Sequence, residues 1–345
     1  MAITRLRLEN FTAFEGLELT PSPGINAFIG TNATGKTHLM KVLYAACAIS
    51  KTQDNFAEKL IRVFLPSKRK LGRLVRRQPG TSRCVVEIER RAPSHDTLSL
   101  RASFSTRANA AKSAEIDGAE AWFKSPVESV YIPVKEMLAN APGFRSLYAQ
   151  REIYFEEIYA DILDHAYLPP LRGRMDERRR RLLGILQEEM DGKVRVADEE
   201  FFLKSQRGDL EFSLLAEGVR KLGLLWLLIQ NGTLLEGSVL FWDEPETNLN
   251  PVLFGMVVDI LLELQRQGVQ VFLATHDYVL AKELDLRQRE DDRVQFTVLY
   301  RPEEAKGRVV AQTAARFAGL EPNPIMEAFA NLYDRQVEHS LKDLV

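Results

Sequence analysis

Residues 30–37 have the types and the spacing of a loop that binds phosphate groups. They read Gly-Thr-Asn-Ala-Thr-Gly-Lys-Thr, which fits the pattern G-x-x-x-x-G-K-[ST]. Glycines let the backbone wrap closely around phosphates, and free N–H groups at the start of a helix bind anions. In such a loop Lys36 reaches the β- and γ-phosphates, and Thr37 ligates Mg²⁺. The predicted nucleotide-binding residues are Gly30, Thr31, Asn32, Ala33, Thr34, Gly35, Lys36 and Thr37.

Two carboxylates and a histidine follow apolar stretches later in the chain. Asp243 and Glu244 come directly after Val-Leu-Phe-Trp at 239–242. Asp243 is expected to hold Mg²⁺, directly or through water, and Glu244 to polarise an attacking water molecule. His276 ends a second apolar stretch, from where it can reach the γ-phosphate or that water. These residues predict a site that binds ATP and Mg²⁺ and hydrolyses the nucleotide.

The elements that must position these residues alternate between strands and helices. The predicted strands are Ala2–Glu9, Gly16–Leu19, Ile25–Ile29, Val239–Trp242 and Val269–Ala274, and the predicted helices are Lys36–Ser50, Val219–Ile229, Val252–Arg266 and one from about Tyr278. Such alternation is typical of an α/β fold with a mainly parallel sheet. We therefore expect a P-loop nucleotide-binding fold.

The segment 62–107 is strongly basic. It holds 12 Lys or Arg and 3 Asp or Glu, in a chain whose formal net charge is −2. Strands are predicted at Arg83–Arg90 and Leu98–Phe104, with a further one at Val127–Pro133. The segment can bind a phosphate backbone or an acidic protein, or it can be a solvated charged arm. The candidate contact residues are Lys68, Arg69, Lys70, Arg73, Arg76 and Arg77.

A charged, mostly helical stretch follows at 145–191, and strands are expected to pair at Lys193–Val196 and Asp209–Ser213. Within it, the run Arg178–Arg181 favours salt bridges along a helix. The predicted organisation is an ATPase head at 1–60 and 205–320, a β-rich basic arm at 61–135, a helical insertion at 136–204 and a C-terminal helix at 321–345.

Composition limits the class of protein. Apolar residues make up 45% of the chain and charged residues 27%, which is typical of a globular protein. Cys47 and Cys84 cannot form a disulfide framework and are expected to be reduced thiols. The longest apolar stretches, such as Leu222–Ile229, are too short to cross a bilayer. We expect a cytoplasmic protein with no membrane partner.

The three motifs, in this order, resemble the ABC-type ATPase head, and most of all the heads of SMC, RecF and OLD-type proteins. The run 243–251 resembles their D-E-P-E-x-H-L-H-P sequence, with Asn248 and Asn250 where His is common. Residues 275–277 resemble their switch-histidine loop. The signature position holds Ala216, Glu217 and Gly218, with Ala216 where the family has Ser. The expected Gln is absent from residues 131–136.

The segments Arg151–Ala166 and Ala328–Leu341 resemble small AAA-family ATPases of bacterial antiphage-defence and abortive-infection systems. This resemblance implies a sensor or regulator of a separate effector, such as a nuclease or toxin. It also implies an ATP-bound head-to-head homodimer, or a higher homo-oligomer, because ATP then lies between the phosphate loop of one subunit and the signature of another. Hydrolysis would be slow and dependent on that assembly.

Two other functions stay open at this point. One is a RecF-like repair ATPase that clamps DNA, and the other is a scaffold held together by ATP with little turnover. The missing serine at Ala216 favours the scaffold, whereas Glu244 and His276 favour hydrolysis. DNA or an acidic phage protein are the expected partners of the basic arm.

Overall fold

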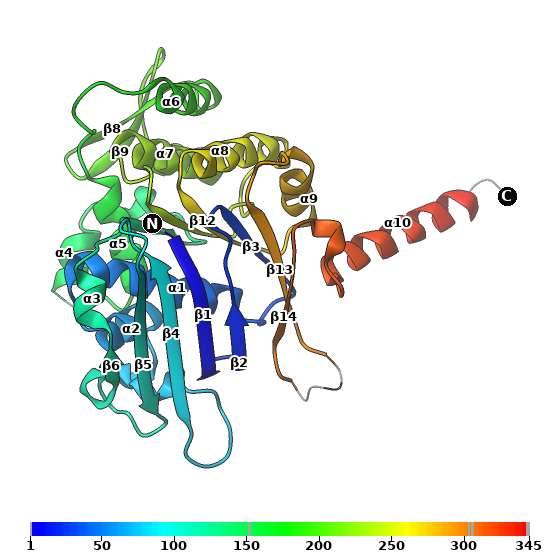
Figure 1. Ribbon diagram of the computed structural model, residues 1–345. Helices are drawn as coiled ribbons and strands as arrows, with labels where there is room; N and C mark the ends of the chain where they lie inside the picture. Colours follow the sequence, from blue (N-terminus) through cyan, green and yellow to red (C-terminus); the bar gives the residue numbers. More distant parts are fainter. Residues whose placement is uncertain (1, 151–152, 303, 305–306, 343–345) are drawn as a thin grey trace.

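The computed structural model describes residues 2–150, 153–302, 304 and 307–342. Its centre is a six-stranded sheet in the order β14-β13-β3-β12-β11-β7, parallel except for β14 (Figure 1). These strands are β3 (Ile25–Ile29), β7 (Ser129–Ile132), β11 (Val239–Asp243), β12 (Gln270–Thr275), β13 (Val294–Tyr300) and β14 (Val310–Ala314). The predicted parallel sheet and α/β class are confirmed.

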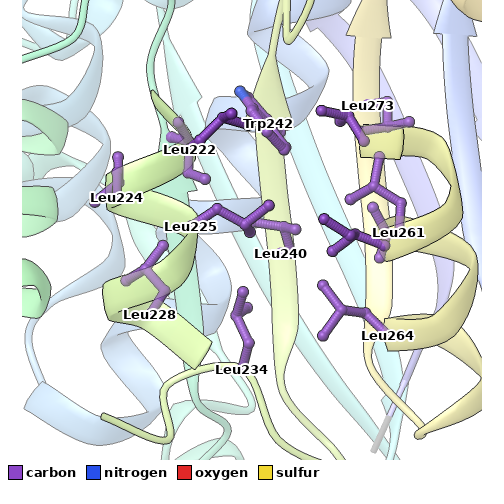
Figure 2. Packing of buried hydrophobic residues seen from close by; sticks show 14 of the residues in the cluster. Leu222, Leu224, Leu225, Leu228, Leu234, Leu240, Trp242, Leu261, Leu264 and Leu273 are labelled. Carbon is purple, nitrogen blue, oxygen red and sulfur yellow. The ribbon is translucent and has the colours of Figure 1, made fainter. Parts of the chain in front are cut away.

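The two faces of this sheet belong to two hydrophobic cores. Leu240 and Trp242 of β11 face one core, together with α7 (Glu217–Gln230) and α8 (Phe254–Arg266), as Figure 2 shows. Phe241, between them, faces the other core, together with α1 (Lys36–Thr52). Alternate side chains of a strand point to opposite faces, so a strand covered on both sides is apolar throughout.

The strands of the basic segment form a second sheet with the N-terminal strands. This five-stranded antiparallel sheet has the order β2-β1-β4-β5-β6. The strands are β1 (Ala2–Phe11), β2 (Phe14–Leu19), β4 (Arg83–Arg91), β5 (Thr97–Ser105) and β6 (Glu115–Asp117). Within the predicted β-rich arm at 61–135, β4 pairs with β1 along its length, and β7 joins the parallel sheet. The apolar faces of β4 and β5 are buried against the same core as α1, which ties them to the head.

A third sheet lies in the insertion, and its pairing differs from the prediction. Its order is β10-β9-β8, with β8 at Lys193–Ala197, β9 at Glu200–Ser205 and β10 at Gly208–Glu211. The expected pairing of the strand at Lys193 with the strand near Asp209 is wrong, because β9 lies between them. Phe201 of β9 is buried and contacts Phe212, which packs under α7 at Gly223.

The remaining helices surround these sheets. They are α2 (Phe56–Phe64), α3 (Ala119–Phe123), α4 (Phe144–Ala149), α5 (Glu157–Ala166), α6 (Glu177–Glu189), α9 (Tyr278–Arg287) and α10 (Pro324–Lys342). Helix α10 projects from the body in Figure 1. The predicted C-terminal helix is confirmed up to Lys342, whereas residues 151–152 and 343–345 of the predicted segments lie outside the described residues.

The predicted salt bridges of the run Arg178–Arg181 are wrong. Arg179 is buried, and its guanidinium donates hydrogen bonds to the backbone oxygens of Ile229 and Gln230 at the end of α7. Its three neighbours form no ion pair with a described residue. Asp176 instead caps α6 by accepting a hydrogen bond from the Arg179 N–H. The run therefore anchors α6 to α7 through one arginine.

Both cysteines are free and buried. Burial raises the pKa of Cys47 to about 12, and it also raises the pKa of Cys84. Among the described helices, none is long and apolar enough to cross a bilayer.

Candidate nucleotide site

Three neighbouring strands bring the predicted site residues to one edge of the parallel sheet. In the register, Ile29 of β3 lies opposite Thr275 of β12, and Ala274 lies opposite Asp243 of β11. The phosphate loop follows β3, Glu244 follows β11 and His276 follows β12. Because the carboxyl ends of parallel strands meet at one edge, the three motifs converge there.

The backbone of the phosphate loop requires glycine at both ends. Gly30 has φ 142°, and a Cβ there would lie 2.2 Å from the Leu299 backbone oxygen. Gly35 has φ 98° and precedes α1, and a Cβ there would lie 2.6 Å from the Phe14 ring. Residues other than glycine rarely adopt these backbone φ angles. The first turn of α1 holds no acidic residue, which suits the N-terminus of a helix to an anion.

Lys36 folds back onto its own loop. Its Nζ donates hydrogen bonds to the backbone oxygens of Gly30 at 2.7 Å and Thr31 at 3.1 Å. Burial lowers the pKa of Lys36, and the carboxylates of Glu244 and Asp243 oppose that effect. The loop therefore holds one buried cation beside acidic groups, in a position to bind a phosphate.

Asp243 is buried, with hydrogen-bond donors on both carboxylate oxygens. Thr37 Oγ1 lies 3.3 Å from Oδ1, and Tyr131 Oη lies 2.9 Å from Oδ2. Burial raises the pKa of Asp243, whereas the hydrogen bonds from Tyr131 and Thr37 lower it. The sequence-predicted pair of Mg²⁺ ligands, Thr37 and Asp243, is thus in direct contact.

Glu244 and His276 are also in contact. His276 Nδ1 lies 3.2 Å from Glu244 Oε1 and 3.8 Å from Glu246 Oε1. Glu244 has φ 48°, in the left-handed region that a non-glycine residue rarely adopts. Its N–H donates to the Ala274 oxygen at 2.8 Å, which holds the turn after β11 against β12. Strained backbone of this kind concentrates at functional sites.

Glu246 accepts two hydrogen bonds from the loop that carries His276. Its Oε1 accepts hydrogen bonds from Thr275 Oγ1 at 2.7 Å and from the His276 N–H at 3.3 Å. Burial raises the pKa of Glu246, and the Thr275 hydrogen bond opposes it. Its Oε2 is buried and has no hydrogen-bond partner among the described residues. The loop that carries His276 is therefore fixed by a carboxylate from the segment after Glu244.

The signature residues lie apart from the phosphate loop of their own chain. Ala216 is the N-cap of α7 and is exposed, and its methyl group forms no capping hydrogen bond. Gly218 is buried beside Asn248, whose backbone oxygen would lie 2.9 Å from a Cβ at this glycine. No hydrogen bond or ion pair of the described residues joins Ala216, Glu217 or Gly218 to residues 30–37. Within one chain, the structure thus does not bring the signature residues into contact with the phosphate loop.

The candidate contact residues of the basic segment lie near the phosphate loop, after α2. Five of them are exposed and form no ion pair with a described residue: Lys68, Arg69, Lys70, Arg73 and Arg77. Arg76 instead pairs with Glu15 at 3.4 Å. At the end of α2, the Phe64 ring lies 5.6 Å from that of His38 on α1. This contact places the end of α2, four residues before Lys68, beside the first turn of α1.

A family model described as "AAA domain, putative AbiEii toxin, Type IV TA system" matches residues 25–282, which is more than half of the chain. The chain belongs to this AAA family. The match includes the phosphate loop, the two carboxylates and His276, and family membership supports ATP hydrolysis in general.

Solved structures show which fold this AAA-family chain has. An SMC head bound to the C-terminal winged-helix domain of ScpA matches with a TM-score of 0.60 and 12% identity, over 91% of this chain and 98% of that one. The SMC head of Thermotoga maritima matches with a TM-score of 0.51 and 14% identity, over 91% of this chain and 99% of that one. The chain therefore has the fold of an ABC-type ATPase head, as the motifs predicted.

Curated relatives match over shorter segments. The DNA replication and repair protein RecF of Renibacterium salmoninarum is 31% identical over 118 residues, which is 34% of this chain and 28% of that protein. A fluoroquinolones export ATP-binding protein of Mycobacterium tuberculosis is 40% identical over 74 residues, 21% of this chain and 20% of that protein. The chain thus matches about a quarter of the length of these relatives.

Three further residues contact the site of this AAA-family chain and were not predicted from the sequence. Tyr131 lies on β7, beside β11, so its contact with Asp243 depends on strand register. Glu246 belongs to a recognised run, but its contacts require the fold. Arg301 follows β13 and donates a hydrogen bond from Nη2 to the Ala33 oxygen at 2.6 Å. Of the three, only Glu246 could have been predicted from the sequence, because it lies in the run 243–251 that resembles the family motif.

Proposed function

We propose that this protein binds ATP with Mg²⁺ and hydrolyses it at a site shared between two copies of the chain, and that the assembled dimer regulates a separate effector. The observation that carries the proposal is the arrangement at the sheet edge. Lys36, Thr37, Asp243, Glu244 and His276 converge there, while the signature at the start of α7 forms no hydrogen bond or ion pair with the phosphate loop among the described residues. A second copy would supply that missing half.

The residues present fit the nucleotide and the metal. Gly30 and Gly35 shape a loop around a helix N-terminus, and Lys36 can turn from its carbonyl partners to phosphate oxygens. Among the described residues, no group of three metal-binding side chains could hold a metal ion alone. Thr37 and Asp243 would therefore hold Mg²⁺ together with nucleotide oxygens. When bound, Mg²⁺ neutralises charge on the β- and γ-phosphates.

The chain's own residues supply the rest of the chemistry. Glu244 would accept a hydrogen bond from the attacking water and orient it. His276, 3.2 Å from the Glu244 carboxylate, would hold that carboxylate in place and donate to the γ-phosphate. Tyr131 would position Asp243, since its hydroxyl already binds the oxygen that Thr37 does not contact.

Two copies related by a two-fold axis would each present the start of α7 to the other's phosphate loop. Such an interface is isologous, so one pair of copies forms two composite sites. The free N–H groups at the start of α7 can bind an anion, although Ala216 provides no hydroxyl and Glu217 adds an acidic side chain to the first turn. Hydrolysis would remove the γ-phosphate that joins the two copies and shift the population toward the open state.

The proposed role is regulation of a nuclease or toxin effector in antiphage defence, in the cytoplasm. Its support is the family, whose description names a toxin of a toxin–antitoxin system. A RecF-like DNA-repair ATPase is the second candidate. It is supported by the RecF match and by the exposed cations Lys68, Arg69 and Lys70. The repair function predicts hydrolysis that DNA stimulates without any second protein.

Sedimentation of Glu244→Gln with and without ATP tests the shared site. This variant keeps the phosphate loop but removes the carboxylate that orients water, so ATP should convert it to a dimer or a larger species. Lys36→Ala is the matched control and should stay unchanged on adding ATP, because its loop lacks the phosphate-binding cation. An ATP-bound Glu244→Gln that remains monomeric would contradict the proposal.

A further inference from the structure

The amino-terminal edge of the parallel sheet carries a hollow of about 1080 Å³. Gly237, Gly268 and Arg293 line it, and they precede β11, β12 and β13. The phosphate loop follows the opposite end of β3. Since β3 spans five residues, the two places are separated by about 17 Å of strand, at roughly 3.3 Å per residue. The hollow is therefore distinct from the nucleotide site.

Arginine dominates the charge of this hollow. Its lining holds six arginines, three carboxylates and no lysine. The arginines come from the end of β4, the first turns of α6, the end of α8 and the segment before β13: Arg91, Arg178, Arg181, Arg266, Arg289 and Arg293. These segments are far apart in the sequence, so the fold gathers the arginines.

One of these arginines is neutralised within the protein. Arg266 binds Asp292 through two hydrogen bonds, from Nε to Oδ1 at 2.8 Å and from Nη2 to Oδ2 at 2.6 Å. The other five are exposed and form no ion pair with a described residue. On α6, the buried Arg179 anchors the helix to α7, and its neighbours Arg178 and Arg181 line the hollow. Two free guanidinium groups thus project from a firmly held helix.

We propose that this hollow binds the phosphate backbone of a short single-stranded nucleic acid. Guanidinium groups form paired, charge-assisted hydrogen bonds to phosphate oxygens. Five free groups from separate segments match a ligand with several phosphates rather than one. Ligand pockets commonly measure about 300–1,000 Å³, so a hollow of this volume has room for a few nucleotides.

The lining residues also determine how the single-stranded nucleic acid is recognised. Its described residues include no Phe, Tyr or Trp on which bases could stack. Recognition therefore rests on the backbone, is independent of sequence and weakens as salt concentration rises.

This site differs from the candidate contact residues at 68–77, although Arg91 of the segment 62–107 lines it. Residues 68–77 end at the far end of β1, where the Arg76 N–H donates to the Asn10 oxygen. The hollow is lined by Ala2–Thr4, at the start of the same strand. Thr4 and Asn10 are six residues apart along β1, or about 20 Å at ~3.3 Å per residue. The two basic surfaces can therefore be altered independently.

The test compares two double charge reversals in the full-length protein. Arg178→Glu/Arg181→Glu alters the hollow, and Lys204→Glu/Arg207→Glu, at the end of β9 and in the turn after it, is the matched control. All four side chains are exposed and unpaired among the described residues, so both variants should fold, which thermal unfolding verifies. Fluorescence anisotropy measures binding of a short fluorescein-labelled single-stranded DNA and of the corresponding duplex.

We expect the wild-type protein and the control to bind the single strand alike. Arg178→Glu/Arg181→Glu should bind it about tenfold more weakly or worse, with a shallower dependence on salt. The proposal is overturned if the wild-type protein does not bind the single strand, or if both variants lose affinity equally. It is also overturned if the duplex binds the wild-type protein more tightly than the single strand.

Discussion

The hydroxyl of Tyr131 donates a hydrogen bond to Asp243, with Oη 2.9 Å from Oδ2. The two residues lie on the adjacent strands β7 and β11, and both side chains are buried. The Tyr131 ring also stacks on Phe241, so its position is fixed by packing as well as by the hydrogen bond. Through this contact, a strand outside the three motifs sets the orientation of the proposed Mg²⁺ ligand.

Tyr131→Phe should weaken both the fold and the site. The change leaves a buried carboxylate oxygen without its donor, which costs about 1–3 kcal/mol of unfolding free energy. Asp243 also loses its orientation, so a higher Mg²⁺ concentration should be needed for half-maximal ATPase rate. Urea unfolding and Mg²⁺ titration of the rate measure the two effects.

Tyr44→Phe is the matched control for this change. The Tyr44 hydroxyl also donates to a carboxylate, Asp161 Oδ2, at 2.7 Å, but that carboxylate lies on α5. This variant should lose less stability, because Lys59 Nζ also donates to Asp161 Oδ2 at 2.7 Å, and it should keep the Mg²⁺ requirement of the wild-type protein. If the two variants show the same Mg²⁺ dependence, Tyr131 has only a structural role.

Substitutions at Ala216 should change turnover in opposite directions. Ala216→Ser and Ala216→Asp both supply a side chain that can cap α7, so both should preserve or raise its stability. Ser adds a donor for a phosphate oxygen and should raise the ATPase rate several-fold, whereas the Asp carboxylate repels that phosphate and should abolish turnover. Steady-state phosphate release distinguishes them, and equal rates would show that the start of α7 meets no nucleotide.

Stability should fall in mild acid because of His38. Burial, with a smaller effect from Lys41, lowers the pKa of His38 from 6.5 to about 4. Between these values the unfolded chain binds more protons than the folded protein, so the free energy of unfolding decreases as pH falls from about 6.5 toward 4. At about 1.4 kcal/mol per pKa unit, the loss near pH 5 is about 2 kcal/mol.

His38→Leu removes the titrating group and should flatten this part of the pH profile. The His38 Nδ1 has no hydrogen-bond partner among the described residues, so an apolar side chain breaks no such contact there. Urea unfolding of both proteins at pH 7 and pH 5 provides the comparison. Parallel losses of stability in the two proteins would assign the acid sensitivity to other groups.

Local patterns were enough to predict the centre of the molecule. The strand Ile25–Ile29 has the predicted bounds, because an apolar run between two glycines leaves little freedom. The phosphate loop, the carboxylates after β11 and the histidine after β12 also lie at the same sheet edge, as parallel strands require. In each of these cases the motif directly follows, in the sequence, the strand that positions it.

Other features depend on contacts that no local pattern reveals. The turn between β8 and β9 consists of Asp198 and Glu199, both with positive φ. Glycine or asparagine usually marks such a turn, so β9 was missed and its neighbours were paired wrongly. The contacts of Tyr131 with Asp243 and of Arg301 with Ala33 likewise join segments more than 100 residues apart. The hairpin of β13 and β14 was also not predicted.

A mixing experiment tests most directly whether the ATPase site is shared between two copies. Glu244→Gln lacks the proposed water-orienting carboxylate, and Ala216→Asp carries a signature that repels phosphate. In a mixed pair, the phosphate loop of Ala216→Asp meets the intact signature of Glu244→Gln, so one of the two sites is complete. Half of randomly formed pairs are mixed, so an equimolar mixture combined before ATP is added should regain roughly a quarter of the wild-type rate once ATP joins the copies. A mixture that hydrolyses ATP no faster than the average of the two separate variants would contradict the shared site.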